Sequence, residues 1–197
     1  MNSLLAVISI ITVAAITPGP NNFIVMTAAS RGGLASVLPT ITGVVGGSLF
    51  LTAIIWVGAG TIFETVPQLR PMLQIAGAAY LVWLGVLLVW KANRRNERTD
   101  GESGAILPAT LLGVATFQLL NPKSWVLVLT ATAAMSDTPS GLIILTALIA
   151  VVTTSCLTLW AWVGSAIAAW LVDPGLRRGF DTVMGLLLIG SAGMLLV

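Results

Sequence analysis

The segment ITPGPNNF, residues 16–23, interrupts an apolar stretch that is otherwise long enough to form a membrane helix. Pro18 and Pro20 each lack a backbone N–H and clash with the preceding turn, so an α-helix cannot pass through them unbroken. Measured from Leu4, the break lies about 20 Å along the helix axis, close to the middle of a bilayer. Unpaired backbone is tolerated at that depth only inside protein or beside a water-filled cavity. The segment therefore predicts a polar site near the membrane midplane.

The overall composition also predicts a membrane protein. Of the 197 residues, 57% are hydrophobic and 8% are charged, whereas a soluble domain carries about 25% charged residues. Because charges of both signs are scarce, we expect no nucleic-acid partner. The chain has no histidine and a single cysteine, Cys156, which excludes an internal disulfide and cysteine–histidine metal clusters. We therefore predict an integral-membrane domain with no metal and no cofactor.

Six apolar stretches are each long enough to cross about 30 Å of hydrocarbon as a helix. They cover Leu4–Ala28, Val37–Phe63, Pro71–Trp90, Ile106–Met135, Gly141–Leu171 and Arg178–Val197. The first stretch lacks a basic flank and a small-residue cleavage site, so we expect a retained helix rather than a signal peptide. The segment KANRRNERTDGESG at 91–104 predicts a flexible loop between two halves. The predicted fold is all-α, with six transmembrane helices in a single domain over 1–197.

Lysine and arginine are unequally distributed between the two sides of this arrangement. The loops after the first, third and fifth helices carry seven basic residues, whereas the opposite side carries Arg70. The seven are Arg31, Lys91, Arg94, Arg95, Arg98, Arg177 and Arg178. Because basic loops remain in the cytoplasm, we predict that these loops are cytoplasmic and that both termini lie outside. Membrane lipid is the expected environment of the helices.

The two halves of the chain resemble each other at three points, in the same order. Pro18 matches Pro122 at an offset of 104 residues, Trp56-Val57-Gly58 matches Trp162-Val163-Gly164 at 106, and the segment from Gly77 matches that from Gly185 at 108. An odd number of spans in each repeat places the second copy upside down, as in many transporters. We therefore predict two inverted three-helix repeats, 1–90 and 106–197, joined by a cytoplasmic loop at 91–105. The first and fourth helices would both be broken at the midplane.

The chemistry of the first break favours a small zwitterion or anion. The prolines free backbone carbonyls around 14–16, and these oxygens can accept hydrogen bonds from an ammonium group, as can the amide oxygens of Asn21 and Asn22. We expect both asparagines to cap the helix that restarts after Gly19. The positive N-terminus of that helix favours a carboxylate. The break therefore offers partners for both ends of an amino acid.

The segment QLLNPKSW, residues 118–125, supplies a counterpart in the fourth stretch. Pro122 breaks the helix, Asn121 can cap the part that restarts, and Lys123 is a basic residue deep within the apolar span. A charge at that depth costs about 2.5–3.5 kcal/mol, so it normally faces a polar interior and marks a pathway. Three roles stay open for Lys123: partner of a substrate carboxylate, counter-charge to a protein carboxylate, or titrating group that couples transport to protons.

These motifs resemble those of the LysE/RhtB amino-acid exporters. The similarity lies in Thr17-Pro18-Gly19-Pro20-Asn21, Asn121-Pro122-Lys123, Arg31-Gly32-Gly33 and Gly43-x-x-x-Gly47, and it extends over essentially the whole chain. The resemblance implies a secondary transporter, not an enzyme, that exports amino acids or related small metabolites across the bacterial cytoplasmic (inner) membrane with the proton gradient as its driving force. It does not fix the substrate, because family members carry basic, hydroxylated, aliphatic or sulfur-containing amino acids. The candidate substrate-binding residues are Thr17, Pro18, Gly19, Pro20, Asn21, Asn22, Asn121, Pro122 and Lys123.

Other features leave alternatives open. Gly43 and Gly47 permit close helix contact, either inside one chain or across a homodimer. Asp181 lies one helical turn after Arg177, which predicts a local ion pair. An ungated pore, or an exporter of another small polar or ionic solute, stays an alternative to an amino-acid carrier. A metal-ion exporter would need midplane carboxylate, cysteine or histidine ligands, and the apolar stretches offer no such set.

Overall fold

The computed structural model describes residues 2–58, 65–66, 68–94, 111–135 and 138–196. Within these residues every regular element is helical, as the sequence predicts. The elements are α1 (Asn2–Ile16), α2 (Pro20–Gly32), η1 (Leu34–Val37), α3 (Leu38–Trp56), α5 (Leu69–Arg94), α6 (Leu111–Leu120), α7 (Pro122–Ala134), α8 (Pro139–Ile167), η4 (Trp170–Val172) and α9 (Pro174–Leu196).

Proline and short polar side chains mark where many of these helices begin. Proline is the first residue of α2, α7, α8 and α9, a position where its missing N–H would have no helical partner anyway. Thr138 caps α8 by accepting a hydrogen bond from the backbone N–H of Gly141 at 3.1 Å. Asp173, the residue before α9, similarly accepts a hydrogen bond from the backbone N–H of Leu176 at 2.8 Å. Local sequence chemistry therefore sets these helix starts.

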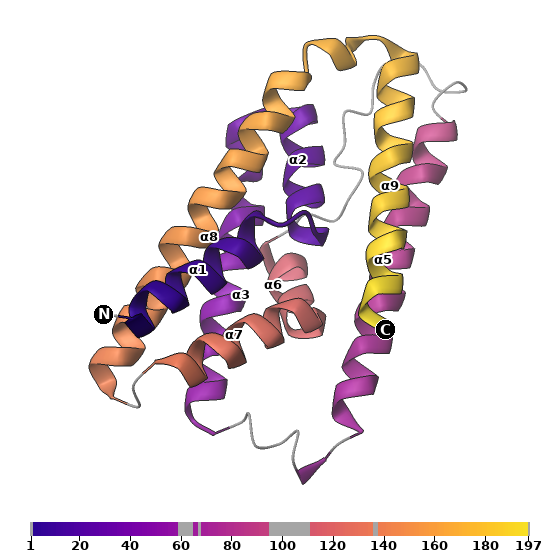
Figure 1. Ribbon diagram of the computed structural model, residues 1–197. Coiled ribbons are helices and arrows are strands. Elements are labelled where there is room, and N and C mark those ends of the chain that lie inside the picture. Colours follow the sequence, from indigo (N-terminus) through magenta and orange to yellow (C-terminus); the bar gives the residue numbers. More distant parts are fainter. Residues whose placement is uncertain (1, 59–64, 67, 95–110, 136–137, 197) are drawn as a thin grey trace.

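Three described helices are long and apolar enough to cross a membrane: Leu34–Trp56, Pro71–Asn93 and Pro139–Ile167. A fourth span results if α1 and α2 are counted together, since they meet at an angle of 53° across a short break (Figure 1). The shorter apolar helices α6 and α7 are likewise separated by a single residue. The structure thus has the helical, membrane-spanning character that the composition predicts.

Two clusters of buried side chains pack the helices around both breaks. One cluster joins α1, α3, α7 and α8, and includes Ile11, Leu51, Val128 and Ile149. The other joins α2, η1, α3, α6 and α8. Because α1 and α7 belong to the first cluster while α2 and α6 belong to the second, each break lies where the chain passes from one cluster to the other.

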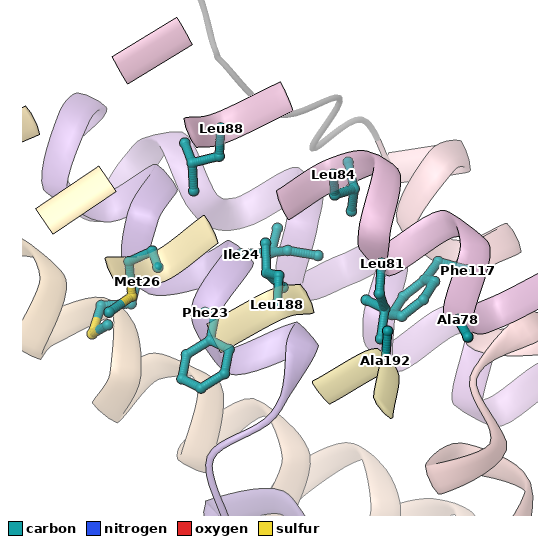
Figure 2. Close-up of a cluster of buried hydrophobic side chains, with 11 residues drawn as sticks. Phe23, Ile24, Met26, Ala78, Leu81, Leu84, Leu88, Phe117, Leu188 and Ala192 are labelled. Carbon is teal, nitrogen blue, oxygen red and sulfur yellow. The ribbon is translucent and has the colours of Figure 1, made fainter. Parts of the chain in front are cut away.

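A third cluster attaches the remaining helices. α5 and α9 pack along each other at one edge of the molecule (Figure 1). Phe23 and Ile24 of α2 meet Leu81 and Leu84 of α5 and Leu188 of α9 in the buried cluster of Figure 2. The position of α2, and with it the first break, is therefore coupled to the α5–α9 pair.

Glycines allow the closest approaches between helices. A Cβ on Gly43 would lie 2.5 Å from the carbonyl oxygen of Leu111, and one on Gly47 would lie 2.8 Å from that of Ala115. The Gly43-x-x-x-Gly47 stripe thus packs α3 against α6 within one chain. This is the first of the two alternatives given for the stripe, contact inside one chain rather than across a homodimer. Gly85 and Gly185 face each other in the same way where α5 crosses α9.

The helix boundaries differ from the predicted ones in several places. α2 runs to Gly32 rather than Ala28, and α9 begins at Pro174 rather than Arg178, so Arg31, Arg177 and Arg178 lie in helix ends and not in the predicted loops. The predicted second span runs to Phe63, but α3 ends at Trp56 and Gly58 follows with a φ of 94°, a conformation that favours glycine; residues 59–64 lie outside the described residues.

The loop predicted from residue 91 starts too early, because α5 continues to Arg94. Asn93 stays helical there, and its amide oxygen accepts hydrogen bonds from Arg178 of α9 at 2.6 and 3.0 Å. The rest of that predicted loop, 95–105, also lies outside the described residues.

Candidate functional site

The first break exposes three backbone carbonyls that the protein itself satisfies. The amide nitrogen of Asn22 donates to the carbonyl oxygens of Ala15 at 3.1 Å and Thr17 at 2.9 Å. The indole N–H of Trp160 on α8 donates to that of Ile16 at 3.3 Å. Pro20 lacks the N–H that would bond the carbonyl of Ile16 in a continuous helix, and the change of direction at the break takes the N–H groups of Gly19 and Asn21 away from Ala15 and Thr17. Side chains replace these donors and join α1 to α2 and α8.

The predicted capping role of Asn21 and Asn22 is wrong. Gly19 is the N-cap of α2, and it has no side-chain capping bond. Because Pro20 occupies the first helical position, the asparagines fall in the following positions of the first turn. Asn22 reaches back to the freed carbonyls, whereas Asn21 reaches across to α6.

The second break follows its predicted chemistry. Asn121 is the N-cap of α7, and its side-chain oxygen accepts the backbone N–H of Lys123 at 3.1 Å. The carbonyl of Leu119, which loses its usual helical donor, accepts the indole N–H of Trp125 at 2.8 Å. At both breaks, polar side chains therefore bond backbone groups that have lost their helical partners.

The two breaks meet at Lys123. Its ammonium group donates to the carbonyl oxygen of Thr17 at 3.1 Å. A Cβ on Gly19 would lie 3.1 Å from the same Nζ atom, so glycine leaves room for the lysine there. The cation of one half of the chain thus touches the broken backbone of the other half.

A small cavity lies between the breaks. Its volume is about 50 Å³, smaller than the cavity of about 150 Å³ that binds one benzene molecule in another protein. A solute of amino-acid size therefore fits between the breaks only if the surrounding helices move apart. The cavity is lined by Ala14, Ala15, Gly19, Pro20, Asn21, Asn22, Val44, Ser48, Gln118, Asn121, Lys123, Ser124, Leu127, Thr153 and Leu157.

Six of the nine sequence-predicted site residues line this cavity: Gly19, Pro20, Asn21, Asn22, Asn121 and Lys123. The side chains of Thr17 and Pro18 are exposed and are not part of the lining, although the carbonyl of Thr17 binds Lys123. Pro122 is the first residue of α7. The structure thus brings both predicted motifs to one place.

The sequence prediction missed a chain of polar side chains in the same wall. Asn21 donates its amide N–H to the amide oxygen of Gln118 at 2.9 Å, and Gln118 donates its own to the hydroxyl of Ser48 at 2.8 Å. Gln118 and Ser48 are 2% and 4% exposed. A glutamine inside the apolar fourth stretch was a visible signal for Gln118. Ser48 carries no such signal, because membrane helices commonly satisfy serine through their own backbone.

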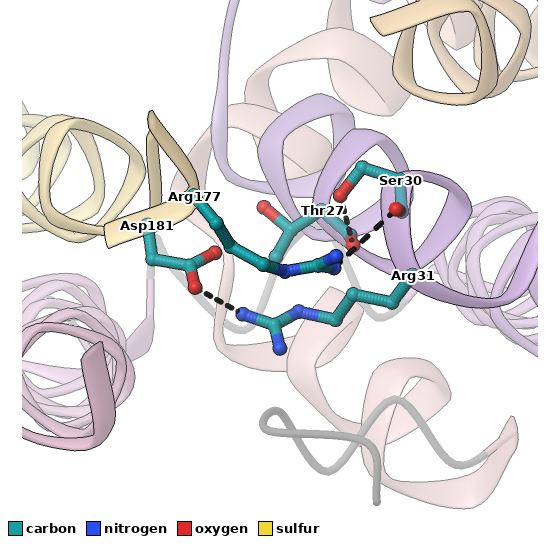
Figure 3. A network of polar contacts seen from close by, with 5 residues as sticks. All are labelled: Thr27, Ser30, Arg31, Arg177 and Asp181. Atoms are coloured by element: carbon teal, nitrogen blue, oxygen red, sulfur yellow. Dashed lines mark hydrogen bonds and ion pairs between the residues drawn. The ribbon is translucent and has the colours of Figure 1, made fainter. Parts of the chain in front are cut away.

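A second polar cluster joins α2 to α9 outside the cavity (Figure 3). Arg31 forms an ion pair with Asp181 at 2.6 Å, and Arg177 donates to the backbone carbonyl of Ser30 at 3.3 Å. The pairing predicted between Asp181 and Arg177 stays a prediction, and the sequence did not indicate Arg31 as a partner. Arg31 reaches the carboxylate because α2 packs against α9.

Comparison with curated proteins finds relatives that are named as efflux proteins. The chain is 31% identical over 113 residues to the leucine efflux protein of Enterobacter sp. (strain 638), covering 55% of this chain and 52% of that protein. It is 28% identical over 187 residues to the homoserine/homoserine lactone efflux protein of Salmonella typhimurium, covering 91% and 90%. The match thus spans about half the length of the leucine efflux protein. No solved structure matches the chain significantly.

The family comparison covers nearly the whole sequence. Residues 12–197 match the family model described as LysE type translocator. This range includes both helix breaks and all residues that line the cavity. The chain therefore belongs to the LysE type translocator family.

Proposed function

We propose that the protein is a secondary transporter that exports neutral amino acids, or closely related small zwitterions, from the bacterial cytoplasm. The observation that carries this proposal is the composition of the cavity between the two helix breaks. It places a lysine ammonium group beside amide groups, and its described lining contains no carboxylate. Such a set can bind the carboxylate and the ammonium group of an amino acid at separate points.

The individual groups suit the two ends of the substrate. Lys123 offers a cation for the carboxylate, and hydrogen bonds between charged groups are the strong ones. The side-chain oxygen of Asn21 is buried and has no hydrogen-bond partner in the part of the chain that the structure describes, so it can accept from the ammonium group. Val44, Leu127 and Leu157 supply apolar surface for a side chain. A basic side chain would place a second cation near Lys123 and is therefore disfavoured.

The family supports transport, and the relatives support the substrate class. A LysE type translocator is a transporter and not an enzyme. The relatives are named for efflux of leucine and of homoserine or its lactone, and leucine and homoserine are amino acids with uncharged side chains. Leucine and homoserine are accordingly the first substrates to test.

We also propose the six-span architecture with two inverted repeats, 1–90 and 106–197, within one domain. The packing supports it: both parts of the first broken helix, α1 and α2, pack on α8, both parts of the second, α6 and α7, pack on α3, and α5 packs on α9. Under the proposed matching of the first, second and third helices to the fourth, fifth and sixth, the first two contacts exchange and the third maps onto itself. Inverted repeats that place broken helices around a midplane site are a general transporter design.

The proposed location is the cytoplasmic (inner) membrane, with the basic loops inside and both termini outside. Ser140 at the start of α8 and Val172 in η4 are exposed and flank a helix of 29 residues. Single cysteines at these positions, in a Cys156→Ala background, should react with an impermeant maleimide from opposite faces, Val172→Cys from the cytoplasmic face. Reaction of both from the same face would exclude this orientation.

Counterflow in proteoliposomes tests the function. Purified protein should exchange labelled leucine or homoserine in a saturable manner, with stimulation by unlabelled amino acid on the other side, and lysine should compete poorly. Imposing a pH gradient should then drive net movement if transport is coupled to protons. Flux that neither saturates nor shows trans-stimulation would identify the alternative, an ungated pore.

A further inference from the structure

We propose that Gln118 and Ser48 are positioning residues that fix the amide of Asn21, so that its oxygen is kept for the ammonium group of the substrate. This inference rests on the proposed function and adds two residues to the site. It follows from the direction of three successive hydrogen bonds.

The donor-to-acceptor direction of these hydrogen bonds is determined by the Ser48 hydroxyl. The Ser48 hydroxyl donates its one hydrogen to the backbone carbonyl of Val44, four residues earlier in α3, at 2.9 Å. A hydroxyl has one donor and two acceptor sites. With its hydrogen committed to the helix, the Ser48 oxygen can receive a hydrogen bond from a neighbouring helix but cannot donate one.

The Ser48 oxygen in turn fixes which way the amide group of Gln118 points. The Gln118 amide nitrogen donates to the Ser48 oxygen at 2.8 Å, which turns its amide oxygen toward Asn21. Gly47 permits the contact, because a Cβ there would lie 2.9 Å from the Cβ and Cγ atoms of Gln118. The glutamine stem is thus held against the backbone of α3, and its 2% exposure leaves it little freedom to turn over.

Asn21 is the last residue in this series of hydrogen bonds. Its amide nitrogen donates to the Gln118 oxygen at 2.9 Å, so its own oxygen is directed away from Gln118. That oxygen is buried and has no hydrogen-bond partner among the described residues. An unmade hydrogen bond at a buried acceptor is costly, and a cation that reaches the oxygen would recover the loss. The reversed amide would instead present N–H groups, which repel an ammonium group.

The experiment compares leucine with 4-methylpentanoate, which is leucine without its amino group, as competitors of labelled-leucine counterflow. In the unmodified protein, leucine should compete at least about tenfold better, because a hydrogen bond to a charged group accounts for a factor of this size. Ser48→Ala removes the hydroxyl that orients Gln118 and should reduce this preference to about threefold or less, mainly through a higher KM for leucine. Gln118→Met keeps a side chain of similar length but loses the amide, and it should reduce the preference as Ser48→Ala does.

Thr52→Val is the matched control. The Thr52 hydroxyl is also buried in α3 and donates to the backbone carbonyl four residues earlier, that of Ser48, at 2.8 Å. Its removal should leave the preference for leucine unchanged. A full preference in both Ser48→Ala and Gln118→Met, or an equal loss in Thr52→Val, overturns the positioning role while leaving export intact. Absence of leucine and homoserine exchange in the unmodified protein overturns the proposed function, and this inference with it.

Discussion

The guanidinium of Arg31 lies 2.6 Å from the carboxylate of Asp181, and this ion pair joins the last turn of α2 to α9. The Asp181 side chain is 1% exposed and that of Arg31 is 16% exposed. Because α2 carries Asn21 and Asn22 into the cavity wall, the pair fixes one side of the candidate site relative to the α5–α9 pair.

Breaking this pair should destabilise the protein. Removal of one partner from a buried ion pair typically costs about 3–5 kcal/mol, since the other charge keeps its desolvation cost. Asp181→Asn should therefore lower the Tm of the detergent-purified protein clearly. The double variant with Arg31→Gln should lose less than the sum of the two single losses. Additive losses would show that the two side chains do not stabilise each other.

The glycines of α3 give a second test, because three of them lie on one helix in different surroundings. Gly43→Ala should destabilise the α3–α6 contact, since its Cβ would lie 2.5 Å from the Leu111 carbonyl oxygen. Gly46→Ala is the control: nothing lies within 4 Å of its Cβ position, and alanine is the better helix former. We expect a lower Tm for the first and an unchanged or slightly higher Tm for the second. Equal Tm values would place the glycine stripe outside any tight contact.

Much of the fold could be predicted from the sequence, because the controlling chemistry is local. Pro18 and Pro122 lack backbone donors wherever they stand, so both breaks follow from the residues alone. The end of α5 does not, because Asn93 is helical and paired with Arg178, which lies far away in the sequence. The ion pair of Asp181 with Arg31 could not be predicted for the same reason. Helical spacing favours Arg177, but tertiary packing supplies Arg31.

The residues of the candidate site also differ in whether they could be identified from the sequence alone. Asn21, Asn121 and Lys123 are conspicuous because polar groups are rare in apolar stretches. Ser48 is not conspicuous, and its importance depends on Gly47, which lets Gln118 approach α3 closely enough to donate to it. Such a chain of hydrogen bonds across three helices becomes visible only when the helices are packed together.

The structure separates the two adjacent asparagines into different roles. Asn22 is 4% exposed and bonds the carbonyls of Ala15 and Thr17 at the break, so Asn22→Ala should reduce the Tm and the amount of protein in the membrane. Asn21→Ala should leave both nearly unchanged and raise the KM for leucine. Abundance on immunoblots and counterflow kinetics check the two variants side by side. A collapse in abundance for Asn21→Ala would make that amide structural.

Lys123 provides the sharpest prediction, because each of its three suggested roles predicts a different result. Its ammonium group binds the Thr17 carbonyl across the two breaks, and the described lining of the cavity contains no carboxylate to serve as its counter-charge. We therefore expect it to bind the substrate carboxylate. Lys123→Gln retains an N–H donor for Thr17 but removes the charge, so the protein should fold and insert while leucine export is lost.

Competition by 3-methylbutylamine, which is leucine without its carboxylate, reports the same contact from the ligand side. The unmodified protein should prefer leucine strongly over the amine, and any exchange that remains in Lys123→Gln should not show this preference. Lys123→Arg keeps a permanent, planar cation, so it should still bind leucine but fail to respond to a pH gradient if the lysine carries the coupling proton. Normal export and normal preference in Lys123→Gln would show that the charge is incidental to the break. The preference for leucine over 4-methylpentanoate should depend on Asn21 and not on Lys123, so the two competitors together test whether each end of the amino acid binds its own residue.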